Sequence, residues 1–153
     1  MRAKRGGELT EPHPTDGGNK GAKRHIAVNG EGVPVACRAA AANVNDTVLF
    51  ERLFLAAFAV MARISTVFAD RGYDAASNRA LCRSFGAEPL IHKRRQPSGS
   101  GLGQKRWPVE RSNAWILENK RLALRYDRLG FIVQALLQTA CIPLVANRLA
   151  REF

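Results

Sequence analysis

Cysteine and histidine are scarce in this chain of 153 residues, with three of each. The cysteines are Cys37, Cys82 and Cys141, and the histidines are His13, His25 and His92. An odd number of cysteines without a close pair supports neither a disulfide framework nor a zinc site. Each cysteine lies beside apolar residues, so we expect reduced cysteines in the core of a cytosolic protein. The histidines lack the spacing of metal ligands, which favours ordinary surface or loop positions.

The sequence also lacks a signal peptide and an uninterrupted membrane span. Its N-terminal segment is polar, without the apolar core that a signal peptide requires. Residues 53–62 are apolar but too short to cross a membrane, and residues 129–146 include Gln134, Gln138 and Pro143. We therefore expect two buried helices and no membrane partner.

Acidic residues are few, with 13 Asp and Glu against 24 Lys and Arg. The formal net charge of +11 opposes compaction through self-repulsion, so an acidic partner is the natural explanation, and nucleic acid is the commonest one. The alternative is a basic face without a partner. The hydrophobic fraction of 46 % is that of an ordinary globular domain rather than a disordered chain.

Apolar periodicity and turn signals predict an order of elements. The chain begins with a strand remnant at 2–5 and an extended loop to 20, and a hairpin follows from 23 with its turn at 30–32. Next come a helix to about 62, a strand at 66–69, a helix to about 85 and a strand at 88–92. A basic loop then leads to two helices, at 108–125 and 129–151. Asn45 or Asp46 can cap the first helix, and Asp74 the second. The order predicts an α/β fold, a mixed sheet packed between helices over residues 21–153.

Asp70 is the first candidate for a functional carboxylate. It follows the wholly apolar run 66–69, which is typical of a central strand buried on both faces. Ligands gather at the carboxyl ends of such strands in open α/β sheets. The alternative is that Asp70 only caps the turn into the next helix, although Asp74 is better placed to cap.

Glu110 is the second candidate. On a helix it shares a face with Trp107, Ala114 and Leu117, and a carboxylate on an apolar, core-facing stripe is costly unless a cation neutralises it. Arg106, four residues earlier, is one such cation. The functional alternative is a Mg²⁺ ion shared with Asp70, which suits phosphodiester chemistry.

Basic residues lie on both sides of the loop that precedes the long helix. They are Lys93, Arg94, Arg95, Lys105 and Arg106. Their place beside the candidate carboxylates favours phosphate contacts over a merely solvated loop. On the same long helix, Trp115 and Leu122 are spaced for a core rather than for a base-stacking platform.

Several stretches together resemble a known family. They are LTEPHPTDGGNKGAKRH, GEGVPVA followed by AANVNDT, FADRGYD, and GSGLGQKRWPVERSNAW followed by KRLALRYDR. In this order they resemble the DDE transposases of insertion-sequence family five, in its short two-frame subgroup, over nearly the whole chain.

The resemblance implies an RNase H-like mixed sheet flanked by helices, and metal-dependent cleavage and strand transfer of DNA. Its Mg²⁺ (or Mn²⁺) would be held by the catalytic Asp70 of the ADRGYD-like motif and Glu110 of the RWxVER-like motif. The implied partners are double-stranded DNA at the element ends and target, and a homodimer on that DNA, in the cytoplasm at the nucleoid. Two positions depart from the family signature, with Gly103 in place of a tyrosine and Leu117 in place of a lysine.

The first aspartate of the family pattern has no match in the sequence. It is expected just before the segment Arg2 to Arg5, the remnant of a first strand that the resemblance places between the hairpin and strand 66–69. Asp16 is no substitute, because it belongs to the separate PTD motif. We therefore expect an N-terminally truncated domain, active only with an upstream segment such as the product of an upstream frame. The alternative is a non-catalytic, basic DNA-binding fragment that competes for element ends.

Overall fold

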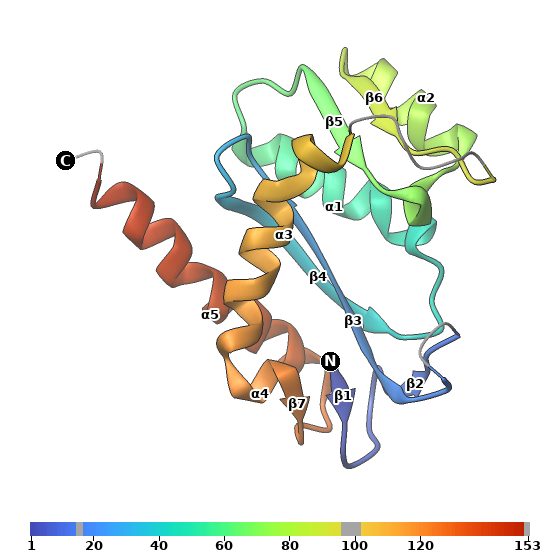
Figure 1. The fold of residues 1–153 in the computed structure, drawn as a ribbon, viewed down its shortest axis with the longest axis vertical. Helices are drawn as coiled ribbons and strands as arrows, with labels where there is room; N and C mark the ends of the chain where they lie inside the picture. Colours follow the sequence, from blue (N-terminus) through green and yellow to red (C-terminus); the bar gives the residue numbers. More distant parts are fainter. Residues whose placement is uncertain (15–16, 96–101, 152–153) are drawn as a thin grey trace.

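The computed structural model describes residues 1–14, 17–95 and 102–151, with only the backbone of 102–106. A long hairpin runs through the middle of the molecule, and helices lie on both sides of it (Figure 1). The helices α1, α2, α3 and α5 and a mixed sheet confirm the predicted α/β class.

The hairpin joins β3 (Lys20–Val28) to β4 (Pro34–Ala41), as predicted. The strands are antiparallel from Ala22 opposite Ala41 to Val28 opposite Pro34. The Asn29 side chain accepts the N–H groups of Glu31 and Val33, each at 3.0 Å, and Gly32 has a φ of +86°. A side-chain amide and a left-handed glycine therefore close the turn.

The strands near the N-terminus correct one expectation. β1 (Arg2–Ala3) pairs antiparallel with β3 at Gly21 and parallel with β7 (Leu124–Arg125). It does not lie between the hairpin and β5 (Thr66–Ala69), which pairs in parallel with β6 (Glu88–Ile91) in a separate two-stranded sheet. β2 (Glu11–Pro12) pairs antiparallel with the same end of β3, at Gly21 and Lys20.

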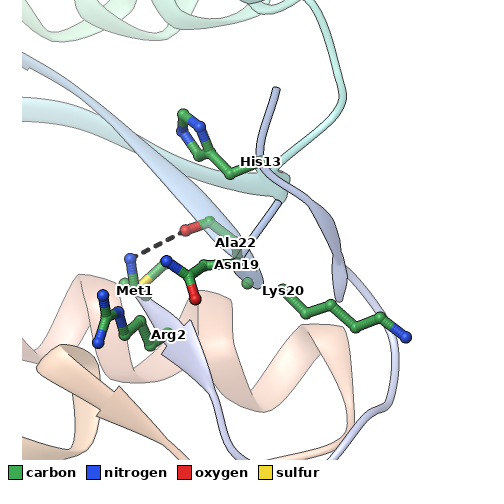
Figure 2. A pocket seen from close by; sticks show the side chains of 7 residues that line it. Met1, Arg2, His13, Asn19, Lys20 and Ala22 are labelled. Carbon is green, nitrogen blue, oxygen red and sulfur yellow. Dashed lines mark hydrogen bonds between the residues drawn. The ribbon is translucent and has the colours of Figure 1, made fainter. Parts of the chain in front are cut away.

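A small hollow marks the contact between β1 and β3 (Figure 2). The Met1 amino group donates to Ala22 O at 3.1 Å, and the Ala22 N–H donates to Met1 O at 3.0 Å. A Cβ atom at Gly21 would collide with Met1 O, so the close approach of the two strands requires glycine there. Farther along the N-terminal loop, Arg125 donates to Glu8 O at 3.0 Å.

The helices α1 (Asp46–Val60) and α2 (Ala76–Ser84) form one core with β6. Asn45 caps α1 by accepting the Thr47 N–H at 3.1 Å, and the helix ends two residues before the predicted Ala62. The buried cluster comprises Phe50, Phe54, Cys82, Ala87 and Ile91. The predicted cap of α2 is wrong, because Ala75 occupies that position and Asp74 instead binds Arg79.

The C-terminal third breaks where one helix was expected. α3 (Leu102–Glu118) starts before Pro108, and Asn119 caps a separate short α4 (Lys120–Ala123), so the prediction of one helix at 108–125 is wrong. Asn119 accepts the Arg121 N–H at 3.1 Å, and this local bond starts a new helix in place of the old one.

α5 (Gly130–Leu149) packs one narrow face against the hairpin. Val133, Leu137 and Cys141 are buried, whereas only 17 % of its most apolar stretch is buried in total, so the expectation of a buried helix at 129–146 is wrong. Among the described residues α5 alone has the length and apolarity of a membrane span, a property that core helices of soluble proteins share. Gln134 accepts the Ala39 N–H at 2.8 Å and so anchors α5 to the outer edge of β4.

Two cysteines that are distant in sequence are neighbours in space. Cys37 on β4 packs against the buried cluster that contains Cys141 of α5. A hydrogen bond from Cys141 lowers the pKa of the Cys37 thiol to about 7. All three cysteines are free thiols; Cys82 and Cys141 are buried as predicted, and Cys37 is half-buried.

Truncating Leu137 should show how much α5 contributes to stability. Leu137 is fully buried, so Leu137→Ala should lower the free energy of unfolding by about 2–5 kcal/mol in urea denaturation. Ile142→Ala on the same helix, where the side chain is 61 % exposed, should change it by less than about 0.5 kcal/mol. Equal losses in the two variants would contradict the packing of α5 described above.

Candidate active site

Asp70 lies at the carboxyl end of β5, as predicted, and begins the 3₁₀ helix η1 (Arg71–Tyr73). Its Oδ1 accepts the Gly72 N–H at 2.8 Å, so Asp70 caps the turn that leads into the next helix, which was the alternative to a functional role. The side chain is exposed. β5 is not buried on both faces, because Phe68 is 38 % exposed and the strand has only β6 beside it among the described strands.

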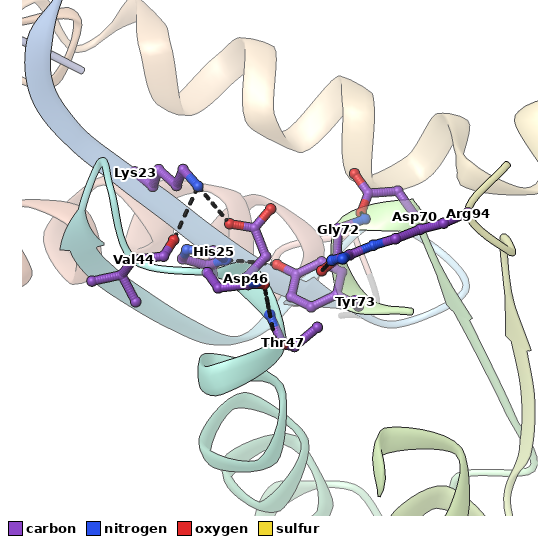
Figure 3. A network of polar contacts seen from close by, with 10 residues as sticks. Lys23, His25, Val44, Asp46, Thr47, Asp70, Gly72, Tyr73 and Arg94 are labelled. Atoms are coloured by element: carbon purple, nitrogen blue, oxygen red, sulfur yellow. Dashed lines mark hydrogen bonds and ion pairs between the residues drawn. The ribbon is translucent and has the colours of Figure 1, made fainter. Parts of the chain in front are cut away.

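Asp46, which the sequence analysis considered only as a helix cap, lies beside Asp70. Its Oδ1 is 2.9 Å from Lys23 Nζ, which also donates to Val44 O at 3.0 Å (Figure 3). A Cβ atom at Gly72 would collide with Asp46 Oδ2 and lie 3.0 Å from Asp70 Oδ1. The two carboxylates therefore approach the same glycine from different elements. The sequence analysis considered both Asn45 and Asp46 as caps of this helix. Because Asn45 alone is the cap, the Asp46 side chain is available for another role, which the sequence analysis missed.

His25 and Tyr73 form a buried polar pair that ties η1 to β3. His25 Nδ1 lies 2.7 Å from Tyr73 Oη, and His25 is 4 % exposed, so the expectation of a surface or loop histidine is wrong for this residue. Burial lowers the pKa of His25, which the charge of Asp46 partly opposes. Burial, together with the charges of Asp46 and Asp70, raises the pKa of Tyr73. Both rings are therefore neutral at neutral pH and hold η1 without adding charge.

Glu110 lies on α3, but on the face opposite to the one expected. Glu110 and Ala114 are exposed, and Trp107 is 51 % exposed. The buried face of the helix is formed instead by Pro108, Ser112 and Ile116. The prediction that Glu110 lies on a core-facing stripe of the helix is therefore wrong. The expectation that Trp115 belongs to the core is wrong as well, since its side chain is 44 % exposed. Because Glu110 is exposed, its burial is no reason to expect a cation beside it. The side chain of Arg106, its suggested partner, lies outside the described residues.

The turn of the hairpin fixes where α3 lies. Ser112 Oγ is 2.5 Å from Gly32 O, and Arg111 donates to Glu31 O at 2.8 Å. A Cβ atom at Gly32 would be 3.0 Å from Arg111 Nη2 and 3.3 Å from Ser112 Oγ, so the fit requires a glycine. At the middle of β3, Arg24 Nε donates to Asn113 Oδ1 at 3.0 Å. α3 also contacts β5, so the helix that bears Glu110 meets the strand that ends at Asp70.

The basic residues that follow β6 border the same turn. Arg94 donates through Nε to Arg71 O at 3.2 Å, and its N–H donates to Asp74 Oδ2 at 2.8 Å. The bond from the Arg94 N–H, with Arg79, lowers the pKa of Asp74, and both bonds of Arg94 hold the start of the basic loop against η1. Lys93 and Arg95 are exposed. The side chains of Lys105 and Arg106 lie outside the described residues.

Two comparisons bear on this site. The model of a family described as the transposase DDE domain matches residues 3–143. The chain is 40 % identical over 149 residues to a Burkholderia cepacia protein named as the transposase for insertion sequence element IS402. That alignment covers 93 % of this chain and 71 % of the Burkholderia protein.

The buried His25 should make stability depend on pH. Its pKa is lower in the folded than in the unfolded chain, so the unfolded chain binds more protons below about pH 6.5 and the free energy of unfolding falls as the pH falls. Urea denaturation between pH 7.5 and pH 5.5 should show this fall. It should be weaker in His25→Gln and unchanged in His13→Gln. A His25→Gln variant with the full pH dependence would assign the effect to other groups.

Proposed function

The chain belongs to the family of transposase DDE domains, and from this premise we propose that Asp70 and Glu110 are its catalytic metal ligands. A transposase of this family acts in the transposition of an insertion sequence. The proposed substrates are the double-stranded DNA of the element ends and of the target, in the cytoplasm at the nucleoid. The observation that carries the proposal is the position of Asp70 at the carboxyl end of β5, a strand that contacts α3, the helix that bears Glu110.

The donors around Asp70 suit Mg²⁺ or Mn²⁺. Both ions prefer oxygen ligands, and Mg²⁺ usually takes one or two carboxylates while water and substrate phosphates complete its shell. Among the described residues no three acidic, histidine or cysteine side chains gather around one point, so protein ligands alone do not complete a site. The chemistry that a bound divalent ion supplies is activation of the attacking oxygen and stabilisation of the leaving oxygen.

The protein's own contribution is to hold these groups in place. The Gly72 N–H fixes one oxygen of Asp70, and the hydrogen bond from Ser112 Oγ to Gly32 O fixes the helix that carries Glu110. We assign phosphate binding to the basic cluster, comprising Lys93, Arg94, Arg95, Lys105 and Arg106. A homodimer on DNA and an upstream-frame product as a further partner are part of the same proposal.

The carboxylate substitutions test the proposal directly. Asp70→Asn and Glu110→Gln should each lower strand transfer by about 10³-fold or more, because catalytic groups that act as a unit fail together. The assay uses residues 1–153 and a version extended upstream, since the family pattern places a further aspartate before Arg2. Each carboxylate variant should also bind Mn²⁺ more weakly in calorimetry.

Glu118→Gln is the matched control, since Glu118 is exposed on the same helix as Glu110. It should leave transfer and Mn²⁺ binding unchanged. Transfer that survives Asp70→Asn would reject the assignment. Salt-dependent duplex binding without metal-dependent transfer in either version would favour the non-catalytic DNA-binding alternative.

Duplex binding should depend on salt through the exposed basic residues. Lys93→Ala with Arg95→Ala should weaken binding to all sequences alike and reduce the slope of log affinity against log salt by about 2. Fluorescence anisotropy with a labelled duplex at several salt concentrations measures both. A matched double variant, Arg63→Ala with Arg83→Ala, removes two exposed arginines elsewhere on the chain and should have a smaller effect. An affinity for duplex DNA that does not change with salt concentration would refute the electrostatic account.

A further inference from the structure

Two thiols that take no part in the proposed site meet where α5 packs on β4. Cys37 lies on β4 directly opposite Ile26 of β3, and it packs against the buried cluster that contains Ile26. Cys141 of α5 belongs to the same cluster and is 8 % exposed. A side-chain hydrogen bond joins the two cysteines. Their sulfur atoms are therefore neighbours, although the two residues are far apart in the sequence.

The contact between α5 and β4 holds this pair in register. Gln134 of α5 accepts the Ala39 N–H at 2.8 Å and donates through Nε2 to Cys37 O at 3.2 Å. Gln134 Nε2 also lies 3.9 Å from Cys37 Sγ. Cys141 follows Gln134 by seven residues, so it lies two turns farther along the same face of the helix. The polar bonds of Gln134 thus keep the face that bears Cys141 against the strand that bears Cys37.

The two thiols differ in reactivity. Cys37 is half-buried, whereas Cys141 is buried. The hydrogen bond from Cys141, together with the charge of Arg38 and a bond from Gln134, lowers the pKa of the Cys37 thiol to about 7, although burial opposes this shift. The bond to Cys37 and burial raise the pKa of Cys141. At neutral pH Cys37 therefore provides the thiolate, the form that reacts with peroxides, and Cys141 remains a thiol beside it.

We propose that Cys37 is a site of oxidation by hydrogen peroxide, and that Cys141 completes a reversible disulfide that links α5 to β4. The Cys37 thiolate attacks one peroxide oxygen, so that an S–O bond forms and the O–O bond breaks. Hydroxide leaves and takes up the proton that Cys37 had released, and Cys37 becomes a sulfenic acid. The Cys141 thiol then attacks the Cys37 sulfur, the S–S bond forms, and the oxygen leaves as water with the thiol proton. Two thiols thereby lose two electrons, and one peroxide is reduced to two waters.

The bond would add a covalent link to a helix that is otherwise held by one narrow face. It would close a loop of about 100 residues and so reduce the entropy of the unfolded chain. Ile116 of α3 packs in the same cluster, so the link would also stabilise the contact between α3 and α5. In a reducing compartment such a bond is transient and reports oxidation. The inference is independent of the proposed function, because neither thiol takes part in strand transfer.

Peptide mapping tests the bond in the unmodified chain. The native protein is treated with a small excess of hydrogen peroxide, its remaining thiols are alkylated in denaturant, and trypsin digestion follows without reductant. The digest should contain the peptide 25–38 linked to the peptide 129–148, since arginines bound both segments. Free thiols should fall from three per chain to one, and dithiothreitol should restore them. Cys82 should remain a thiol, because it is fully buried and burial raises its pKa.

Single substitutions separate the roles of the two cysteines. Cys141→Ala should abolish the linked peptide and leave Cys37 as a sulfenic acid that dimedone traps. Cys37→Ala should abolish both products. Cys82→Ala is the matched control and should give the linked peptide as the unmodified chain does. Circular dichroism shows whether each variant folds, and the mapping of the unmodified chain decides the proposal even if one does not.

Denaturation tests whether the bond forms within the native fold. Oxidation should raise the urea midpoint by about 1 M or more in the unmodified chain and in Cys82→Ala, and should leave it unchanged in Cys37→Ala.

Four outcomes would overturn the proposal. They are three free thiols after peroxide treatment, a disulfide that involves Cys82, a disulfide between two chains on a non-reducing gel, and an oxidised chain with an unchanged midpoint. None of them bears on whether Asp70→Asn abolishes strand transfer, so the two proposals fail separately.

Discussion

The fit between the hairpin turn and α3 is the constraint on which the rest of the site depends. Gly32 adopts a left-handed backbone and leaves no room for a side chain against Arg111 and Ser112. Across this contact Arg111 donates to Glu31 O at 2.8 Å and Ser112 donates to Gly32 O at 2.5 Å. A shift of the turn would move Glu110 together with the other exposed residues of α3. The exposed face of α3 is therefore as well defined as its buried one.

The same strand that leads into this turn also organises the other side of the site. Lys23 and His25 on β3 hold Asp46 and Tyr73, and these two residues flank the turn that carries Asp70. β3 thus contacts both halves of the proposed centre directly. β3 therefore links α3, the helix that bears Glu110, to the turn that bears Asp70, although β5 does not pair with the central sheet.

The sequence predicted those elements of the fold that depend on interactions between residues close together in the chain. The hairpin, the strand that ends at Asp70 and the helix capped by Asn45 follow from glycine turns, apolar runs and one amide cap. The orientation of α3 could not be predicted, because its buried face includes Ser112, which is satisfied by Gly32 eighty residues away. The burial of His25 was missed for the same reason, since its partner Tyr73 is remote in sequence. Hydrophobic periodicity carries no information on such polar contacts.

The charges around Gly72 explain how two carboxylates can lie close together before any cation binds. Two carboxylates that approach the same glycine repel each other, and the Asp46 charge is compensated by Lys23 at 2.9 Å. Arg94 lies on the other side of η1, where it donates to the carbonyl of Arg71. Lys23 is bonded to Asp46 and Val44, whereas Asp70 accepts a hydrogen bond from the Gly72 N–H. Positive charge from Lys23 and Arg94 therefore lies directly beside the carboxylates where the proposed metal would bind, so the same turn offers charges for a cation and for a phosphate group.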